Sequence, residues 1–430
     1  MILLLFILVL ALLLISLYYY GYEIIAPPVI ICAVYTFSIY AAMYNIESWH
    51  IKLSNITVLY IVVGLLSFCL SSFIVRTHYK NKPVPIKRAF VINITNQKTI
   101  ILYLIIFICA YIYIQEVSHI VGGYGGDYET AMADFRSDFS YGDENLSFIA
   151  NQSYKVLTVI TFICLYIYCN NTIATGQWKK YIIWLVPVII LGYATIRSGS
   201  RTPLIQLFVM FIVFLLLFQQ QYGKYKKKAL LKYILYIVGF SILFLVMFSA
   251  IRYLVGRQND SNIVDYISMY VGGSIQLFDL YLKHPNEAMN NNTEVFGALY
   301  NNLIKLGFID DKELIMHKEF RYSNGILLGN VYTSFRAFHH DFGFTGIIIF
   351  QVIEGFFYSI YYEKMKRLKN KSGISATFIL YGMLMMPLFE HAIQEQLFSN
   401  YLCLNTFILL FLTIIIIHYL KPKLYATKSF

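Results

Sequence analysis

Apolar runs recur along most of this chain, separated by short polar turns. Most approach the roughly 20 residues that a helix needs to cross a hydrocarbon layer about 30 Å thick. The pattern predicts an all-α, polytopic membrane protein with about eleven transmembrane helices. The run at 157–169 is short and is expected to begin about a turn earlier. The predicted spans are residues 3–20, 24–43, 57–75, 99–114, 157–169, 181–196, 203–218, 231–251, 343–362, 374–389 and 402–420.

The apolar pattern is interrupted by one long polar segment, residues 252–342. Connectors between spans can be much shorter, so a long loop of this kind is expected to bind or catalyse. Within it, residues 263–282 are amphipathic and carry Asp265, Gln276 and Asp279. This stretch is expected to form an interfacial helix; the alternative is a twelfth span. No repeat or shift in composition divides the chain, so residues 1–430 are expected to form a single membrane domain.

Composition agrees with this class of protein. Hydrophobic residues make up 58% of the 430 positions and charged residues only 13%, against about a quarter in soluble proteins. The first span lacks a basic leader and a small-residue cleavage site and is expected to be retained. All six cysteines fall within predicted spans without a CxxC pair, which favours neither disulfides nor a thiolate metal site.

The charges predict the topology. Alternate short loops and the C-terminal tail hold 21 of the 34 lysines and arginines, so these segments should face the cytoplasm. The opposite side holds 20 of the 23 acidic residues. The loops at 252–342 and 116–154 and the turn at 197–202 then share the external face. The net charge of +11 reflects this topology and contact with anionic membrane lipids, and it requires no nucleic acid.

The sharpest local feature on the external face is the turn Arg197-Ser198-Gly199-Ser200-Arg201-Thr202-Pro203. Pro203 suits the first turn of the next helix, and Thr202 or Ser200 suits its N-cap. A helix N-terminus beside Arg197 and Arg201 is a candidate pyrophosphate site. The alternative is that both arginines only reach lipid headgroups. Arg252 and Arg257, which follow the span at 231–251, would complete an anion clamp on the same face.

The end of the long loop gathers polar and aromatic residues directly before a span. Asn330, Tyr332, Thr333 and Arg336 are candidates for glycan binding. His340 and Asp341 are candidate acid–base residues; Asp341 is in any case expected to cap the helix that begins at Gly343.

Further carboxylates lie at or within the later spans. Glu390, followed by His391, is a third candidate acid–base residue, with Gln394 and Glu395 close by; the alternative is a polar helix end. Glu354 lies inside a span, where an ionisable side chain points to function or to an interhelical contact.

The loop at 116–154 contains Gly122-Gly123-Tyr124-Gly125-Gly126 but lacks the Lys and Ser/Thr of a P-loop, so a mobile lid or a plain loop is expected there. Asp127 and Glu129 are weak evidence for a metal, and no common catalytic or nucleotide motif is present. Neither a cofactor nor a metal is expected.

The chain resembles the O-antigen and oligosaccharide repeat-unit polymerases, the Wzy-type family. The resemblance rests on the span pattern, the long loop before the last three spans, the turn at Ser198–Arg201, and the stretch Asn330-x-Tyr332-Thr333 … Asp341-x-Gly343-x-x-Gly346. It covers nearly the full length. The chain departs from members whose two external loops carry regularly spaced arginine repeats, so a catch-and-release scheme between two loops is not carried over.

The resemblance implies a GT-C-like glycosyltransferase in the bacterial inner membrane, with residues 252–342 and 116–154 as periplasmic loops. Such an enzyme moves a growing glycan from one undecaprenyl pyrophosphate to a second undecaprenyl-linked repeat unit. Arg201 and Arg252, and with less support Arg197 and Arg257, would hold pyrophosphate, and a chain-length regulator would be a partner. The alternatives are a lipid-linked oligosaccharide flippase, which should carry more charge inside its spans, and an O-antigen ligase, which shares the architecture.

Overall fold

The computed structural model describes residues 1–82, 84, 88–141, 145–235, 239, 262–285, 293–309, 318–368, 373–421 and 423–426. Among these, eight helices are long and apolar enough to cross a membrane: α1 (Ile2–Tyr19), α2 (Pro27–Tyr44), α3 (Asn55–Lys80), α4 (Asn96–Gly123), α6 (Phe148–Thr175), the continuous pair η1 (Trp178–Leu185) and α7 (Val186–Arg197), α8 (Thr202–Gln221) and α12 (Ser334–Arg367). Two shorter apolar helices follow, α13 (Ala376–Glu390) and α14 (Leu404–Leu420).

These ten helices coincide with ten of the eleven predicted spans, and the fold is all-α, as expected of a multi-pass membrane protein. The remaining span, 231–251, lies mostly outside the described residues. The other elements are short or polar: α5 (Tyr128–Tyr141), η2 (Lys227–Ala229), α10 (Ile263–Lys283), α11 (Gly297–Lys305), η4 (Leu397–Tyr401) and the strands β1 (Phe90–Asn93), β2 (Arg321–Ser323), β3 (Ile326–Gly329) and β4 (Lys423–Ala426).

Two boundaries differ from the sequence prediction. Helix α6 begins at Phe148, nine residues before the predicted span, because the Ser147 hydroxyl accepts a hydrogen bond from the Ala150 N–H and caps the helix. Helix α4 continues to Gly123, through the first two glycines of the Gly-rich segment. The connection between them is therefore shorter than 116–154, and it contains helix α5.

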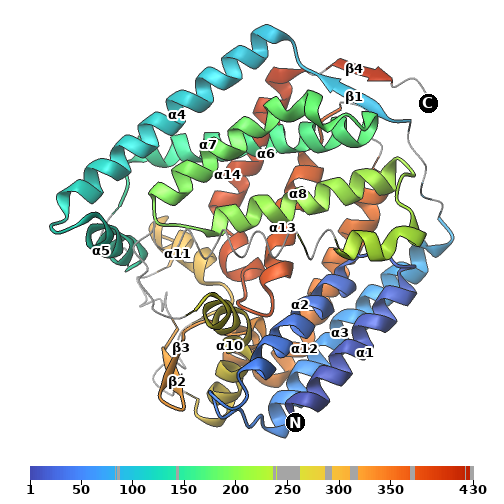
Figure 1. Cartoon of the computed structure of the whole chain (residues 1–430), viewed down its shortest axis with the longest axis vertical. Coiled ribbons are helices and arrows are strands. Elements are labelled where there is room, and N and C mark those ends of the chain that lie inside the picture. The colour runs from blue at the N-terminus through green and yellow to red at the C-terminus, as the bar shows by residue number, and fades with distance from the viewer. Residues whose placement is uncertain are drawn as a thin grey trace.

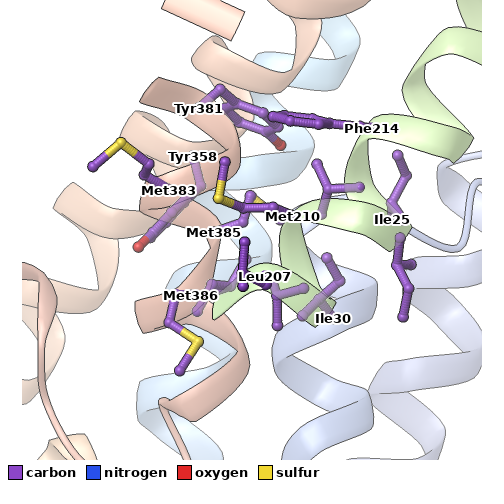
Figure 2. Close-up of a cluster of buried hydrophobic side chains, with 14 of the residues drawn as sticks. Ile25, Ile30, Leu207, Met210, Phe214, Tyr358, Tyr381, Met383, Met385 and Met386 are labelled. Carbon is purple, nitrogen blue, oxygen red and sulfur yellow. The ribbon is translucent and has the colours of Figure 1, made fainter. Parts of the chain in front are cut away.

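The centre of the molecule is built from α6, α8, α13 and α12. Helix α6 is buried over most of its length. Figure 2 shows Leu207, Met210 and Phe214 of α8 lying against the methionines of α13, with Tyr358 of α12 and Ile30 of α2 beside them. Methionine side chains are flexible and fill irregular gaps between helices. The polar residues discussed below are held at the edge of this packed centre.

Residues 263–283 form a helix, as their amphipathic pattern predicts, but two of its polar residues, Gln276 and Asp279, are buried, whereas Asp265 is exposed. It packs along α2, where a Cβ on Gly272 would lie 2.5 Å from the Ala42 backbone nitrogen. Small residues at a helix contact permit such close approach. Asp279 accepts hydrogen bonds from the Ser54 N–H (2.8 Å) and the Thr57 hydroxyl (2.6 Å) at the start of α3. A carboxylate at a helix N-terminus is favourable, so α10 is fixed against both α2 and α3.

Helix α12 begins nine residues before the predicted span and bends at Gly343. The glycine has φ 62° and ψ −160°, a conformation that residues with a Cβ rarely adopt. The segment from Ser334 to Phe342 is therefore a separate helical stretch, and it carries Arg336, His340 and Asp341.

The connecting segments gather at two ends of the helix bundle. At one end β1 pairs antiparallel with β4, which joins the connection before α4 to the C-terminal segment. At the other end lie α5, α10, α11 and the β2–β3 hairpin, in the lower left of Figure 1, opposite β1 and β4. The segments that the charge pattern assigns to the external face are thus gathered together, and this end is called the external end below.

Candidate functional site

The turn between α7 and α8 lies at the external end. Gly199 has φ 70°, and Pro203 falls in the first turn of α8, as predicted. The expected N-cap was wrong: Arg201 occupies that position and Thr202 is already helical. The Arg201 guanidinium is buried beside α10, where it donates a hydrogen bond to the Tyr266 hydroxyl (2.8 Å) and lies 5.9 Å from the centre of the Tyr270 ring.

A cavity of about 690 Å³ opens beside this turn, and we call it the anion cavity. It is lined by Ser198, Gly199, Ser200 and Arg201, by Arg136 of α5, and by Glu390 and Gln394 from the end of α13 and the segment after it. Two of the predicted site residues, Arg201 and Glu390, are therefore brought to one cavity although 189 positions separate them in the sequence. The cavity combines cationic groups with a carboxylate.

Glu390 is held in a fixed orientation on the wall of the anion cavity. Its Oε2 accepts hydrogen bonds from the Gln394 amide (2.8 Å) and the Gln396 amide. The side chain of His391 does not pair with Glu390. It lies 3.0 Å from the Glu354 carboxylate on one ring nitrogen and 3.0 Å from the Tyr35 hydroxyl on the other. The mid-span carboxyl singled out in the sequence is thus part of a buried contact between α2, α12 and the end of α13.

Arg197 points away from the anion cavity. Its guanidinium donates to the Ser118 hydroxyl (2.9 Å) and to the Tyr128 hydroxyl (3.3 Å), on α4 and α5. Arg197 and Arg201 therefore do not form one clamp. Arg252 and Arg257, the other two predicted anion ligands, lie outside the described residues.

Asp341 connects the first part of α12 to the segment before α11. Its two oxygens accept hydrogen bonds from the backbone N–H groups of Glu294 (3.0 Å) and Val295 (2.9 Å). His340 Nδ1 lies 2.8 Å from the same carboxylate. The prediction that Asp341 caps a helix beginning at Gly343 was wrong, because residues 334–342 are already helical. Both carboxylate oxygens hold the loop in place.

Arg336 lies in a buried ion cluster next to the predicted glycan-binding segment. Its guanidinium donates to Glu294 (2.9 Å) and Glu319 (2.6 Å) and lies 4.0 Å from the centre of the Tyr332 ring. Burial would raise the pKa of Glu319, but the nearby positive charges, Arg336 foremost, outweigh it and lower that pKa. Arg336 thus organises this part of the loop. Thr333 occupies the N-cap position of α12 and is fully buried.

Asn330 and Tyr332 line a second cavity of about 370 Å³, which we call the amide cavity. Its wall includes Asn301, Gln394, Asn400, Thr293 and Ser399, and the ionisable residues Glu294, Lys318 and Glu395. Burial raises the pKa of Glu395 to about 7, although the Phe398 and Ser399 N–H groups donate to it. Burial lowers the pKa of Lys318, against the opposing effect of Glu294.

Sequence reasoning missed Arg136, Gln394 as a wall residue, and Lys318. Arg136 did carry a signal: it is the only lysine or arginine in a segment, 116–144, that holds seven acids. The pairing of Gln394 with Glu390 is local, four residues apart, and the sequence already places the two side by side. The pairing of Lys318 with Glu294 left no sequence signal, because it depends on how the long loop folds.

No protein-family model, curated protein or solved structure matches the chain.

Proposed function

We propose that this protein is a membrane glycosyltransferase that polymerises oligosaccharide repeat units carried on undecaprenyl pyrophosphate, making an O-antigen or capsule-type polysaccharide. It would act on the periplasmic side of the bacterial inner membrane. The observation that supports this best is the anion cavity, in which Arg201 and Arg136 share a wall with the fixed carboxylate of Glu390.

The proposed reaction places each group in a role. The acceptor hydroxyl oxygen attacks the anomeric carbon of the growing glycan, and a new glycosidic C–O bond forms. The C–O bond to pyrophosphate breaks, and its electron pair leaves with undecaprenyl pyrophosphate. Arg201 and Arg136 neutralise the charge that develops on that leaving group. The proton of the acceptor hydroxyl passes to a carboxylate.

Glu390 is the preferred proton acceptor in this scheme. It lines the same cavity as Arg201, whereas both oxygens of Asp341 are engaged by backbone N–H groups. His340 is bound to Asp341 and is therefore a weaker candidate. The donor sugar arrives with its own leaving group, so the scheme requires no nucleotide. A chain-length regulator in the same membrane would be a partner.

Deletion of the gene tests the proposal. The deletion strain should carry surface glycan of a single repeat unit, and complementation should restore the long-chain ladder. A long ladder without the gene would exclude a polymerase. Loss of even the single unit would indicate a ligase, and accumulation of repeat units on the cytoplasmic leaflet would indicate a flippase.

Substitutions of Arg201 test the proposed pyrophosphate site. If its planar guanidinium binds pyrophosphate through two hydrogen bonds, lysine cannot replace it, and Arg201→Lys should lose the ladder nearly as Arg201→Ala does. Loss of one such interaction is expected to slow the reaction about 100-fold or more. Both variants are compared in the deletion strain at matched membrane levels. A full-length ladder from Arg201→Ala would remove this residue from the site.

A further inference from the structure

The amide cavity and the anion cavity are neighbours. Val331 and Gln394 line both, and the Gln394 amide donates to Glu390. Glu390, the candidate proton acceptor, lines the anion cavity, and the glutamine bound to it also lines the amide cavity.

The amide cavity has the chemistry of a sugar site. Four carboxamides face it, those of Asn301, Asn330, Gln394 and Asn400, together with the hydroxyls of Thr293 and Ser399. A carboxamide both donates and accepts hydrogen bonds, as does each hydroxyl of a sugar. The charges of Glu294 and Lys318 are paired with each other (3.6 Å), which leaves little net attraction for an anion.

A buried hydroxyl in this wall points to a ligand. Within the described part of the chain, Thr293 Oγ1 is buried and neither accepts nor donates a hydrogen bond. Buried polar atoms usually have a partner, and leaving one without costs about 1–3 kcal/mol. The Glu294 side chain is only 7% exposed, and its Oε2 lies 3.6 Å from its ion-pair partner Lys318. A ligand hydroxyl entering the cavity would supply the hydrogen bond that Thr293 lacks.

We propose that the amide cavity is a sugar-binding subsite that holds the terminal sugar of the acceptor repeat unit. The volume, about 370 Å³, is near the lower end of the range of about 300–1,000 Å³ for small-molecule pockets. It therefore holds a terminal sugar, with the rest of the glycan outside. From there an acceptor hydroxyl reaches Glu390 past Gln394. This assignment rests on the proposed polymerase function and specifies where the acceptor repeat unit binds.

The test separates the two cavities by direct binding to purified full-length protein. The probes are the single repeat-unit oligosaccharide, released by mild acid from the deletion strain and followed by saturation-transfer NMR, and inorganic pyrophosphate, followed by line broadening of its 31P NMR signal. Asn301→Ala on α11 and Asn400→Ala on η4 should each weaken oligosaccharide binding about tenfold, the effect of one lost hydrogen bond. Neither should change pyrophosphate binding. Arg201→Ala should show the opposite pattern.

Asn302→Ala is the matched control. Asn302 is the neighbour of Asn301 on α11, but it does not line the cavity, and its amide donates to the Ala298 carbonyl of its own helix. Asn301→Trp adds a second arm, because its indole should fill the cavity and abolish oligosaccharide binding. If Asn301→Ala, Asn400→Ala and Asn301→Trp all bind the oligosaccharide as Asn302→Ala does, the subsite is excluded. That result would not exclude the polymerase proposal, which the glycan ladder of the deletion strain tests separately.

Discussion

The two ends of this helix bundle bury charged residues in different ways. At the end that carries β1 and β4, Arg76, Lys366 and Arg367 surround Glu363, and Lys366 also contacts Glu23 (2.6 Å). Each carboxylate there has a cation of the protein within contact distance. At the external end, Arg201 and Glu390 instead face a common cavity.

This difference in pairing distinguishes charges with a structural role from charges that are candidates for function. Charges that neutralise each other fix the positions of helices, here the α1–α2 connection, α3 and α12. Charges of opposite sign that face a cavity can act on a ligand. The same distinction applies within the external end, where Arg336 is paired with two glutamates while Arg201 lines the anion cavity. Four variants test this distinction.

The largest effect is expected from Glu363→Ala. Its side chain is fully buried. Among the described residues, its removal leaves Arg76 and Lys366 with Glu23 as their counter-ion and takes away the carboxylate that Arg367 contacts. Breaking a buried ion cluster in this way costs about 3–5 kcal/mol. Thermal unfolding of the detergent-solubilised protein measures the loss, with the exposed Glu47→Ala as control. Equal stability of the two variants would show that this cluster does not hold the helices.

Glu395→Gln should change the pH dependence of stability. The pKa of Glu395 rises from 4.5 to about 7 on folding, so the folded protein resists its ionisation. Stability from this residue is present below pH 4.5 and is lost as the pH rises towards 7. Glutamine does not ionise, so the variant does not lose this stability as the pH rises. Relative to the parent it should gain about 2–3 kcal/mol between pH 5 and 8, at about 1.4 kcal/mol per pKa unit. Parallel melting curves across that range would contradict the shift.

Arg336→Gln should destabilise the protein less than Glu363→Ala. Glu319 keeps Arg321 (2.8 Å) and Glu294 keeps Lys318 (3.6 Å), so neither carboxylate loses all its cations. We expect the free energy of unfolding to fall by about 2 kcal/mol, which is typical of a lost hydrogen bond to a charged group. The melting temperature and the glycan ladder should fall together. A short ladder at unchanged stability would instead place Arg336 in direct contact with the glycan.

Arg197→Ala should have the smallest effect. Its contacts with Ser118 and Tyr128 are partly exposed and lie outside the anion cavity. Surface interactions of this kind contribute at most about 1 kcal/mol. Ladder length should remain close to that of the parent, in contrast to Arg201→Ala. Equal loss of the ladder in the two variants would instead support the clamp of Arg197 and Arg201 that the sequence predicts.

The positions of most helices could be predicted from the sequence alone. In a bilayer each backbone polar group needs a partner within the protein, so apolar runs must be helical, and the hydropathy of α1, α3 and α8 was sufficient to locate them. The distribution of lysines and arginines then predicted which connections lie together, as the pairing of β1 with β4 shows. Pro203 located the start of α8 to within a residue.

Which side chains share a site depends on tertiary packing and could not be predicted from the sequence. Arg197 and Arg201 are four residues apart, yet the turn at Gly199 directs them to α5 and α10 respectively. His391 meets Glu354, and Asp341 holds the N–H groups of Glu294 and Val295, through contacts between distant segments. Hydropathy is a local property that one helix satisfies alone. A cavity is formed by side chains from several helices, and its lining depends on how those helices pack.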